Sequence, residues 1–133
     1  MKHQRFGALG VVLGLLILAL PAAAHHAVVA EFDLSKTFTI SGTISKLEWI
    51  NPHVFIYVDV KDDKGNPVTY TFNNASPGFL RRGGVIKPMF HVGDQVSIAA
   101  FAPKDGTPHR GFISTITFAD GHTIVLSKDG RSD

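Results

Sequence analysis

Alternating apolar and polar residues, interrupted by turn-forming residues about every ten positions, dominate the chain after residue 36. In the segment 53–61, one face consists of Val54, Ile56, Val58 and Val60, and the other of His53, Phe55, Tyr57 and Asp59. A period of two is typical of β-strands with one buried face. Further strands are predicted at 68–73, 96–100, 112–118 and 123–128. This spacing of short strands predicts a small barrel or sandwich.

The first predicted strand, residues 37–49, changes phase along its length. Ile44 lies on the apolar face of its first part, but the apolar positions then move to Leu47 and Trp49. A one-residue shift near Ser45–Lys46 predicts a β-bulge or a sharp bend. Such a bent strand would serve both halves of a barrel.

One segment departs from the strand pattern and predicts a short helix at residues 76–83. In "SPGFLRRGG", Ser76 is a candidate N-cap, Pro77 occupies the first helical position, and glycines follow the last turn. The predicted order is three strands, one helix, and two or three strands. That order favours a mainly β fold, a five- to six-stranded OB-like Greek-key barrel. An open β-sandwich is the alternative.

The first residues have the pattern of a cleavable secretory signal peptide. Lys2 and Arg5 precede an apolar run of residues 8–20, which is shorter than the roughly 20 residues of a transmembrane helix. Small residues at 22–24 form the cleavage site, so the mature chain is predicted to begin at His25. An uncleaved anchor is the alternative. The predicted parts are a signal peptide (1–24), an N-terminal segment (25–36) and the barrel domain (37–130).

The charge balance changes when the predicted signal peptide is removed. The chain has 13 basic and 11 acidic residues, and two of the basic residues, Lys2 and Arg5, lie in the signal. The rest is electrically balanced, which gives no electrostatic reason to expect nucleic acid as a partner. There is no cysteine, so an oxidising compartment is permitted but not used for disulfides. A periplasmic or secreted bacterial protein is predicted, with no transmembrane segment after cleavage.

The predicted mature terminus brings metal-binding groups together. Cleavage would give His25 a free amine beside its imidazole, His26 adds a second imidazole, and His53 follows a proline-fixed turn. Nitrogen donors of this kind favour Cu(II), with Ni(II) and Zn(II) behind it. His109 is a weaker fourth candidate. The opposing interpretation is a terminus whose histidines bind nothing.

A second candidate site is a ligand face on the barrel. Its predicted members are Trp49, Phe55, Tyr57, Arg81 and Arg82. The aromatic residues would contact a ligand, and the two arginines, with help from Lys87, would bind an anion. The opposing interpretations are aromatic packing beneath the helix and a solvated helix end.

Several stretches together resemble a family of small exported bacterial proteins catalogued only as a domain of unknown function. They are "HHAVVAEFD", "LEWINPHVFIYVDVKDDKG", "SPGFLRRGG" and "APKDG…TFADGHT", which span nearly all of the chain after residue 24. The double histidine and the W-x-N-P-H stretch are the most specific parts. The resemblance implies export and no particular activity.

Three functions follow as hypotheses. The first is a periplasmic protein that binds a divalent metal, Cu(II) or Zn(II), at His25, His26 and His53. The second is a β-barrel module that binds an envelope protein or a small ligand without metal. The third is an enzyme subunit with a terminal copper site. The sequence contains no catalytic motif such as H-E-x-x-H or G-x-S-x-G, so a binding protein is favoured over an enzyme.

Overall fold

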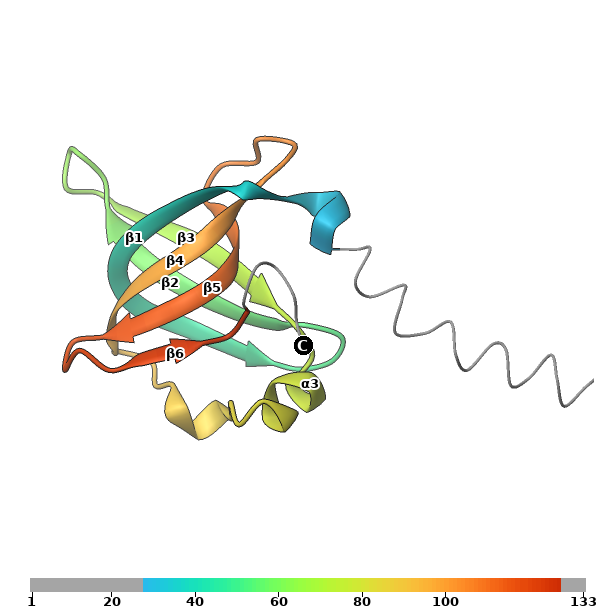
Figure 1. Ribbon diagram of the computed structural model, residues 1–133. Coiled ribbons are helices and arrows are strands. Elements are labelled where there is room, and N and C mark those ends of the chain that lie inside the picture. The colour runs from blue at the N-terminus through green and yellow to red at the C-terminus, as the bar shows by residue number, and fades with distance from the viewer. Residues whose placement is uncertain (1–27, 128–133) are drawn as a thin grey trace, which may run out of the picture.

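A computed structural model describes residues 28–127 as a ring of strands with one short helix at its end (Figure 1). A helical turn at residues 28–31 precedes the first strand. The elements are β1 (Phe32–Trp49), β2 (Val54–Lys61), β3 (Pro67–Asn74), α3 (Pro77–Arg82), the 3-10 helix η1 (Lys87–Met89), β4 (Gln95–Pro103), β5 (Arg110–Phe118) and β6 (Thr123–Val125).

The strands form one sheet that closes on itself. Its order is β3-β2-β1-β4-β5-β6, and β3 also pairs with β5. The closing pair is parallel, through Thr71 with Arg110 and Asn73 with Phe112, whereas the other pairs are antiparallel. With α3 between β3 and β4, this is the strand order of an OB-type ring. The predicted mainly β, OB-like fold is confirmed.

The first strand serves both halves of the ring, as its sequence predicts. Residues 32–43 pair with β4, and residues 43–49 pair with β2. The register with β2 shifts between Ile44 and Lys46, so the predicted bulge is confirmed. The extra residue, Ser45, donates a hydrogen bond from its hydroxyl to Oδ1 of Asp59 (3.1 Å). The bend is thus tied to the neighbouring strand.

The main core fills the interior of the ring. Apolar side chains that are completely buried there include Ile44, Val54, Ile56, Val58, Phe72, Ile98, Ile113 and Ile116. The segment from α3 to Phe90, the residue directly after η1, contributes Leu80, Val85 and Phe90 to the same cluster. It therefore closes one end of the ring, below the strands in Figure 1.

The short helix begins and ends where its sequence predicts. The hydroxyl of Ser76 accepts a hydrogen bond from the backbone N–H of Phe79, and Pro77 starts the helix. Gly84 has a φ of 82° and donates its N–H to the carbonyl of Arg81. Glycine adopts this left-handed conformation without steric cost, so the chain can turn sharply after the helix.

Three local features differ from the expectations, and one of them is β6, which ends at Val125 although the sequence predicts a strand over 123–128. The first strand begins at Phe32 rather than at Thr37, and its pairing with β4 is irregular between Asp33 and Thr37. The η1 turn lies in a stretch for which the sequence predicts no helix. Within residues 28–127, no helix has the length and apolar character that crossing a membrane requires.

Candidate functional site

The N-terminal turn, residues 28–31, is held against the ring. The side chain of Val28 packs on a small apolar cluster, separate from the main core, that contains Phe32, Phe101 and Phe112. The Lys104 ammonium donates a hydrogen bond to the carbonyl of Val29 (2.6 Å), and the backbone N–H of Lys104 donates to the carbonyl of Glu31 (2.8 Å). These contacts order the turn without a ligand.

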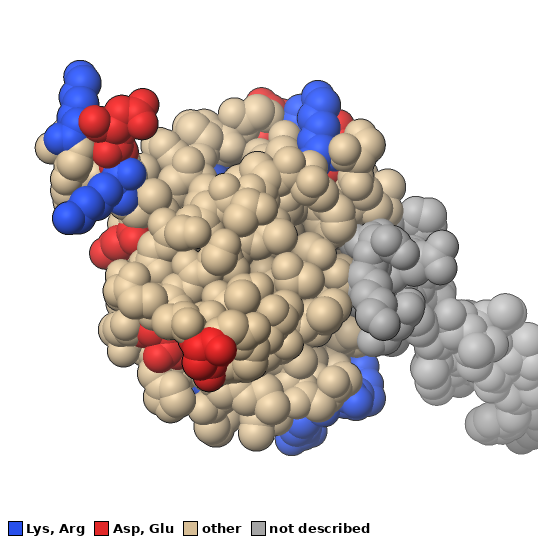
Figure 2. All heavy atoms as spheres, turned by 60° about the vertical axis from the view of Figure 1, so that its left-hand side comes forward, with Lys and Arg blue, Asp and Glu red and all other residues tan. Residues whose placement is uncertain are grey.

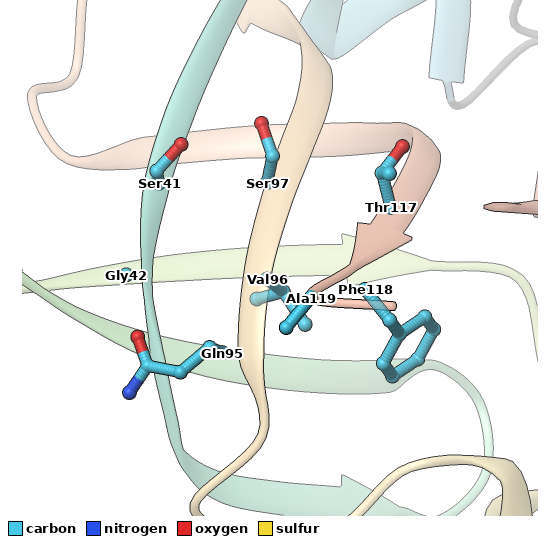
Figure 3. A pocket seen from close by; sticks show the side chains of 8 residues that line it. All are labelled: Ser41, Gly42, Gln95, Val96, Ser97, Thr117, Phe118 and Ala119. Carbon is cyan, nitrogen blue, oxygen red and sulfur yellow. The ribbon is translucent and has the colours of Figure 1, made fainter. Parts of the chain in front are cut away.

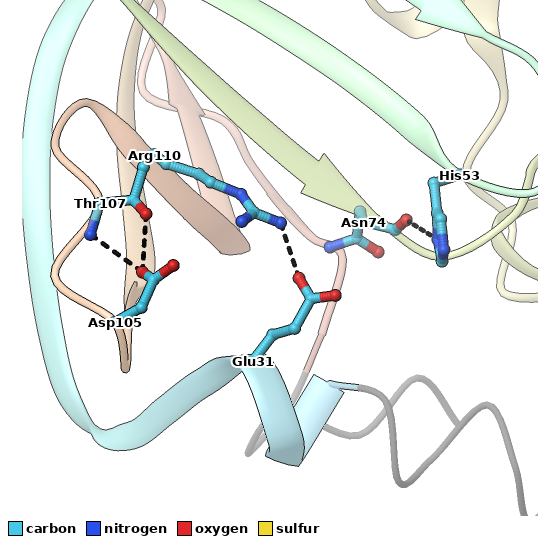
Figure 4. Close-up of polar contacts among 6 residues, drawn as sticks. All are labelled: Glu31, His53, Asn74, Asp105, Thr107 and Arg110. Carbon is cyan, nitrogen blue, oxygen red and sulfur yellow. Dashed lines mark hydrogen bonds and ion pairs between the residues drawn. The ribbon is translucent and has the colours of Figure 1, made fainter.

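The carboxylate of Glu31 is also anchored. Nη2 of Arg110 donates to its Oε2 at 2.6 Å (Figure 4). In the loop before Arg110, Oδ1 of Asp105 accepts hydrogen bonds from the N–H (2.9 Å) and the hydroxyl (2.7 Å) of Thr107. These two bonds, the backbone one first, lower the pKa of Asp105. The loop that carries Arg110 is therefore shaped by its own hydrogen bonds.

A small cavity of about 30 Å³ lies beside this turn. Its walls are Val28, Glu31, Phe32, His53, Asn73 and Phe112. Asn73 is only 9% exposed, and its Oδ1 is the one buried side-chain polar atom without a hydrogen-bond partner in residues 28–127. Leaving such a group unpaired costs roughly 1–3 kcal/mol. The cavity therefore favours an occupant that donates a hydrogen bond or carries positive charge.

His53 is oriented from two sides. Its Nδ1 lies 3.2 Å from the backbone carbonyl oxygen of Asn74 (Figure 4), and the ring of Phe55 meets the imidazole edge-on, with centroids 6.5 Å apart. Because a carbonyl only accepts hydrogen bonds, Nδ1 donates in this contact, and the neutral imidazole then has the tautomer with its proton on Nδ1. The lone pair of Nε2 is then available. Histidines that bind metals commonly hold their other nitrogen in this way.

The remaining predicted metal ligands do not join His53 in the described part of the chain. His25 and His26 lie outside residues 28–127. Inside that range, no three side chains of His, Cys, Asp or Glu gather closely enough to hold a metal ion. The imidazole of His109 lies against Tyr70, with ring centroids 4.9 Å apart. A metal site at His53 therefore requires further donors.

A larger hollow of about 440 Å³ lies beside α3. Its lining residues come from the end of β1 and the turn after it, from α3, and from the chain leading into η1: Trp49, Asn51, Pro77, Gly78, Arg81, Ile86 and Lys87. It brings together Trp49 and Arg81, two of the five predicted ligand-face residues. Lys87, which the sequence analysis linked to anion binding, lies here as well.

The other three predicted ligand-face residues lie elsewhere. Phe55 and Tyr57 are on the outer face of β2, since they alternate with the buried positions of that strand. The guanidinium of Arg82 lies over the ring of Phe79, 5.3 Å from its centroid. Unlike Phe55 and Tyr57, Trp49 packs against the core, and its ring centroid lies 5.6 Å from that of Phe90. The structure therefore divides the predicted face between two sides of the sheet.

Tyr57 belongs to a polar triad on the outer face. Its hydroxyl donates to Oε2 of Glu48 (2.9 Å), and Nζ of Lys46 lies 2.6 Å from Oε1. The hydrogen bond from Lys46, followed by that from Tyr57, lowers the pKa of Glu48. Burial, followed by the hydrogen bond to Glu48, raises the pKa of Tyr57. The three side chains of the triad interact with one another, so none of them is left as a free acid or base.

Glu48→Gln is expected to lower the pKa of Tyr57 towards its ordinary value. The change removes the negative charge that disfavours the phenolate and weakens the hydrogen bond that holds the phenol proton. A Tyr70→Phe background leaves Tyr57 as the only tyrosine, so its ionisation is measured by the ultraviolet absorbance of tyrosinate. Glu31→Gln is the control and leaves the titration unchanged. An unaltered titration in Glu48→Gln would contradict the role of this hydrogen bond.

A groove of about 350 Å³ crosses the outer face of β1, β4 and β5. Three hydroxyl-bearing residues lie side by side across it, because Ser41 pairs with Ser97 and Ser97 pairs with Thr117 (Figure 3). In Figure 2 the centre of the visible face carries no Lys, Arg, Asp or Glu side chain, and one acidic group lies in its lower left part. None of the residues that line this groove is charged, so nothing in it would select a charged ligand.

Two residues of the small cavity, Glu31 and Asn73, are not among the sequence predictions. Glu31 lies in a segment without a clear period, and Asn73 reads as the polar end of a strand. The stretch "TFNNA" contains a signal for a buried asparagine, because one of two neighbouring strand residues must face the interior of the sheet. Adjacent asparagines at the end of a strand point to opposite faces, and both Asn73 and Asn74 are buried.

Comparison with known proteins identifies a family and no activity. The family model described as "Family of unknown function (DUF6152)" matches residues 12–125, a range that includes all three predicted metal ligands. The predicted membership of a family of unknown function is confirmed. No curated protein and no solved structure matches the chain.

Proposed function

The chain belongs to that family of unknown function, and we propose that it is an exported periplasmic or secreted protein that binds a divalent transition metal. Copper(II) is the first choice and Zn(II) the second. The ligands are His25, with its imidazole and the amine that cleavage would free, together with His26 and His53.

One observation carries this proposal. Val28 and His53 line the same cavity of about 30 Å³, so the N-terminal turn lies beside the imidazole. His25 is three residues before Val28, and an extended chain of that length spans about 10 Å. The turn is already anchored by Lys104. Little further chain ordering is therefore needed to bring the terminal nitrogens to His53.

The side chains around the small cavity support the binding of a cation there. The Nδ1 contact to the carbonyl of Asn74 leaves Nε2 of His53 available. Asn73, whose Oδ1 is unpaired, and Glu31, whose carboxylate already pairs with Arg110, line the same cavity, and both side chains carry oxygen atoms that attract positive charge. A set made mainly of nitrogen donors, with no thiolate in the chain, suits Cu(II) better than Cu(I).

The test is a Cu(II) titration of the exported protein. Its N-terminal residue is first established by sequencing, and His25 is expected. Calorimetry is expected to show one copper per chain, and the electron paramagnetic resonance spectrum to show nitrogen coordination. His53→Ala is expected to weaken binding at least about tenfold, the effect of losing roughly 1.4 kcal/mol of ligation energy. One additional residue before His25 is expected to weaken it as well.

His91→Ala provides the matched control, since His91 is exposed and pairs with Asp94. Its copper affinity is expected to equal that of the unaltered protein. Circular dichroism establishes that each variant is folded. Equal affinity in the unaltered protein, His53→Ala and the extended chain would refute the proposal.

A further inference from the structure

The hollow beside α3 is lined by hydrogen-bond donors that have no acceptor. In residues 28–127, the indole N–H of Trp49 and the side-chain amide of Asn51 make no hydrogen bond, and Arg81 and Lys87 form no ion pair. Some other cations of the described chain are engaged, such as Lys46 with Glu48 and Arg110 with Glu31, whereas Lys61 and Lys64 also form no ion pair. These donors are therefore available to a ligand.

The charge of the hollow has one sign. None of its lining residues is acidic, and two of them, Arg81 and Lys87, are basic. Two cations without a carboxylate partner create a positive potential that attracts anions. A guanidinium and an ammonium also form hydrogen bonds with carboxylate or phosphate oxygens that are stronger than bonds between neutral groups.

Trp49 adds a flat apolar wall. Its indole is half-buried and packs against the ring of Phe90, so the neighbouring core limits its movement. Ile86, which is 41% exposed, contributes further apolar surface. The volume of about 440 Å³ lies in the range of small-molecule sites. The hollow thus combines a stacking surface with anion-binding donors.

We infer that this hollow binds a small planar organic anion. The ring of the ligand lies against Trp49, and its carboxylate or phosphate group accepts hydrogen bonds from Arg81 and Lys87. This site uses none of the three histidines of the proposed metal centre. It stands or falls independently of copper binding.

The test uses the fluorescence of Trp49, the only tryptophan of the chain. Benzoate and phenyl phosphate are the probes. Inorganic phosphate offers the anion without the ring, and benzyl alcohol offers the ring without the charge. The two probes are expected to change the emission of Trp49 saturably, and inorganic phosphate and benzyl alcohol to bind about tenfold more weakly or not at all. The amide signals of Asn51 and Gly78 in nuclear magnetic resonance spectra are expected to shift with the same saturation curve.

Arg81→Gln and Lys87→Gln are the informative variants. Each is expected to weaken the binding of both probes about tenfold, as expected for the loss of a charge-assisted hydrogen bond. Arg82→Gln is the matched control, since that guanidinium lies over Phe79. It removes the same charge from the same helix and leaves binding unchanged.

Four results would overturn the inference. They are no saturable binding of either probe, equal binding of inorganic phosphate, equal binding of benzyl alcohol, and an equal loss in Arg82→Gln. The three substituted residues, Arg81, Arg82 and Lys87, are exposed. The charge variants are therefore expected to fold normally, which circular dichroism checks.

Discussion

Gly42→Ala is expected to destabilise the fold by roughly 3 kcal/mol, the upper end for overpacking in a well-packed site. A Cβ atom at this position would lie 2.3 Å from the carbonyl oxygen of Asp59 and 2.8 Å from Cγ1 of Val58. The first neighbour is backbone, so no side-chain rotation relieves the contact. Gly42 lies where β1 passes from β4 to β2, and both pairings are disturbed if the strands move apart.

Urea unfolding followed by circular dichroism measures this loss. Gly78→Ala is the control, because the added Cβ has no atom within 4 Å and the residue lies inside α3. It is expected to be neutral or to stabilise by about 0.5–1 kcal/mol, since alanine favours a helix over glycine. Equal stabilities of the two variants would mean that β1 and β2 do not approach as closely as described.

Asn74→Asp is expected to cost about 3 kcal/mol or more at neutral pH. Asn74 is completely buried, its Nδ2 donates to the carbonyl of Ile113 (2.7 Å), and its Oδ1 accepts from the N–H of Ala75 (2.8 Å). The substitution leaves a carboxylate facing the carbonyl of Ile113. It thereby removes a buried hydrogen bond and introduces a buried charge without a partner.

The loss is expected to depend on pH. Burial and the facing carbonyl raise the pKa of the introduced carboxyl group above its unfolded value. The folded state then holds the proton more strongly than the unfolded state does. The deficit is therefore smallest below the unfolded pKa, grows as the pH rises through the folded pKa, and is constant above it. Urea unfolding at several pH values measures this, with Asn51→Asp as the exposed control. A deficit that does not vary with pH would contradict the assignment.

The local elements of this fold can be predicted from the sequence. The alternation of Val54, Ile56 and Val58 identifies β2, and the shift of apolar positions after Ile44 marks the bulge, because both depend on side chains close together in the chain. The residue at which β1 begins cannot be predicted in this way. Asp33 accepts hydrogen bonds from the N–H and the hydroxyl of Ser35, and this local turn interrupts the alternation.

The candidate sites are harder to predict from the sequence, because each is formed by segments that are far apart in the chain. His53 stands out by residue type, but only the fold shows that Val28 lies beside it. The sequence predicts a shared ligand face for Trp49, Phe55 and Tyr57 because OB-type barrels bind ligands across their middle strands, and it predicts Arg81 as an anion-binding residue. Which of them share a surface depends on strand orientation and on the position of α3, and neither follows from residue type.

The closure of the ring by β3 and β5 has a consequence for folding kinetics. The β1–β2–β3 meander and the β4–β5 hairpin each join neighbouring segments, whereas the contacts between them join distant ones, such as Thr71 with Arg110 and Thr37 with Phe101. Non-local contacts form only after much chain entropy has been lost, and folds rich in them reach the native state in about milliseconds to seconds. The last step is expected to be the docking of the two halves. Until then, the edges of both remain open to pairing with other chains.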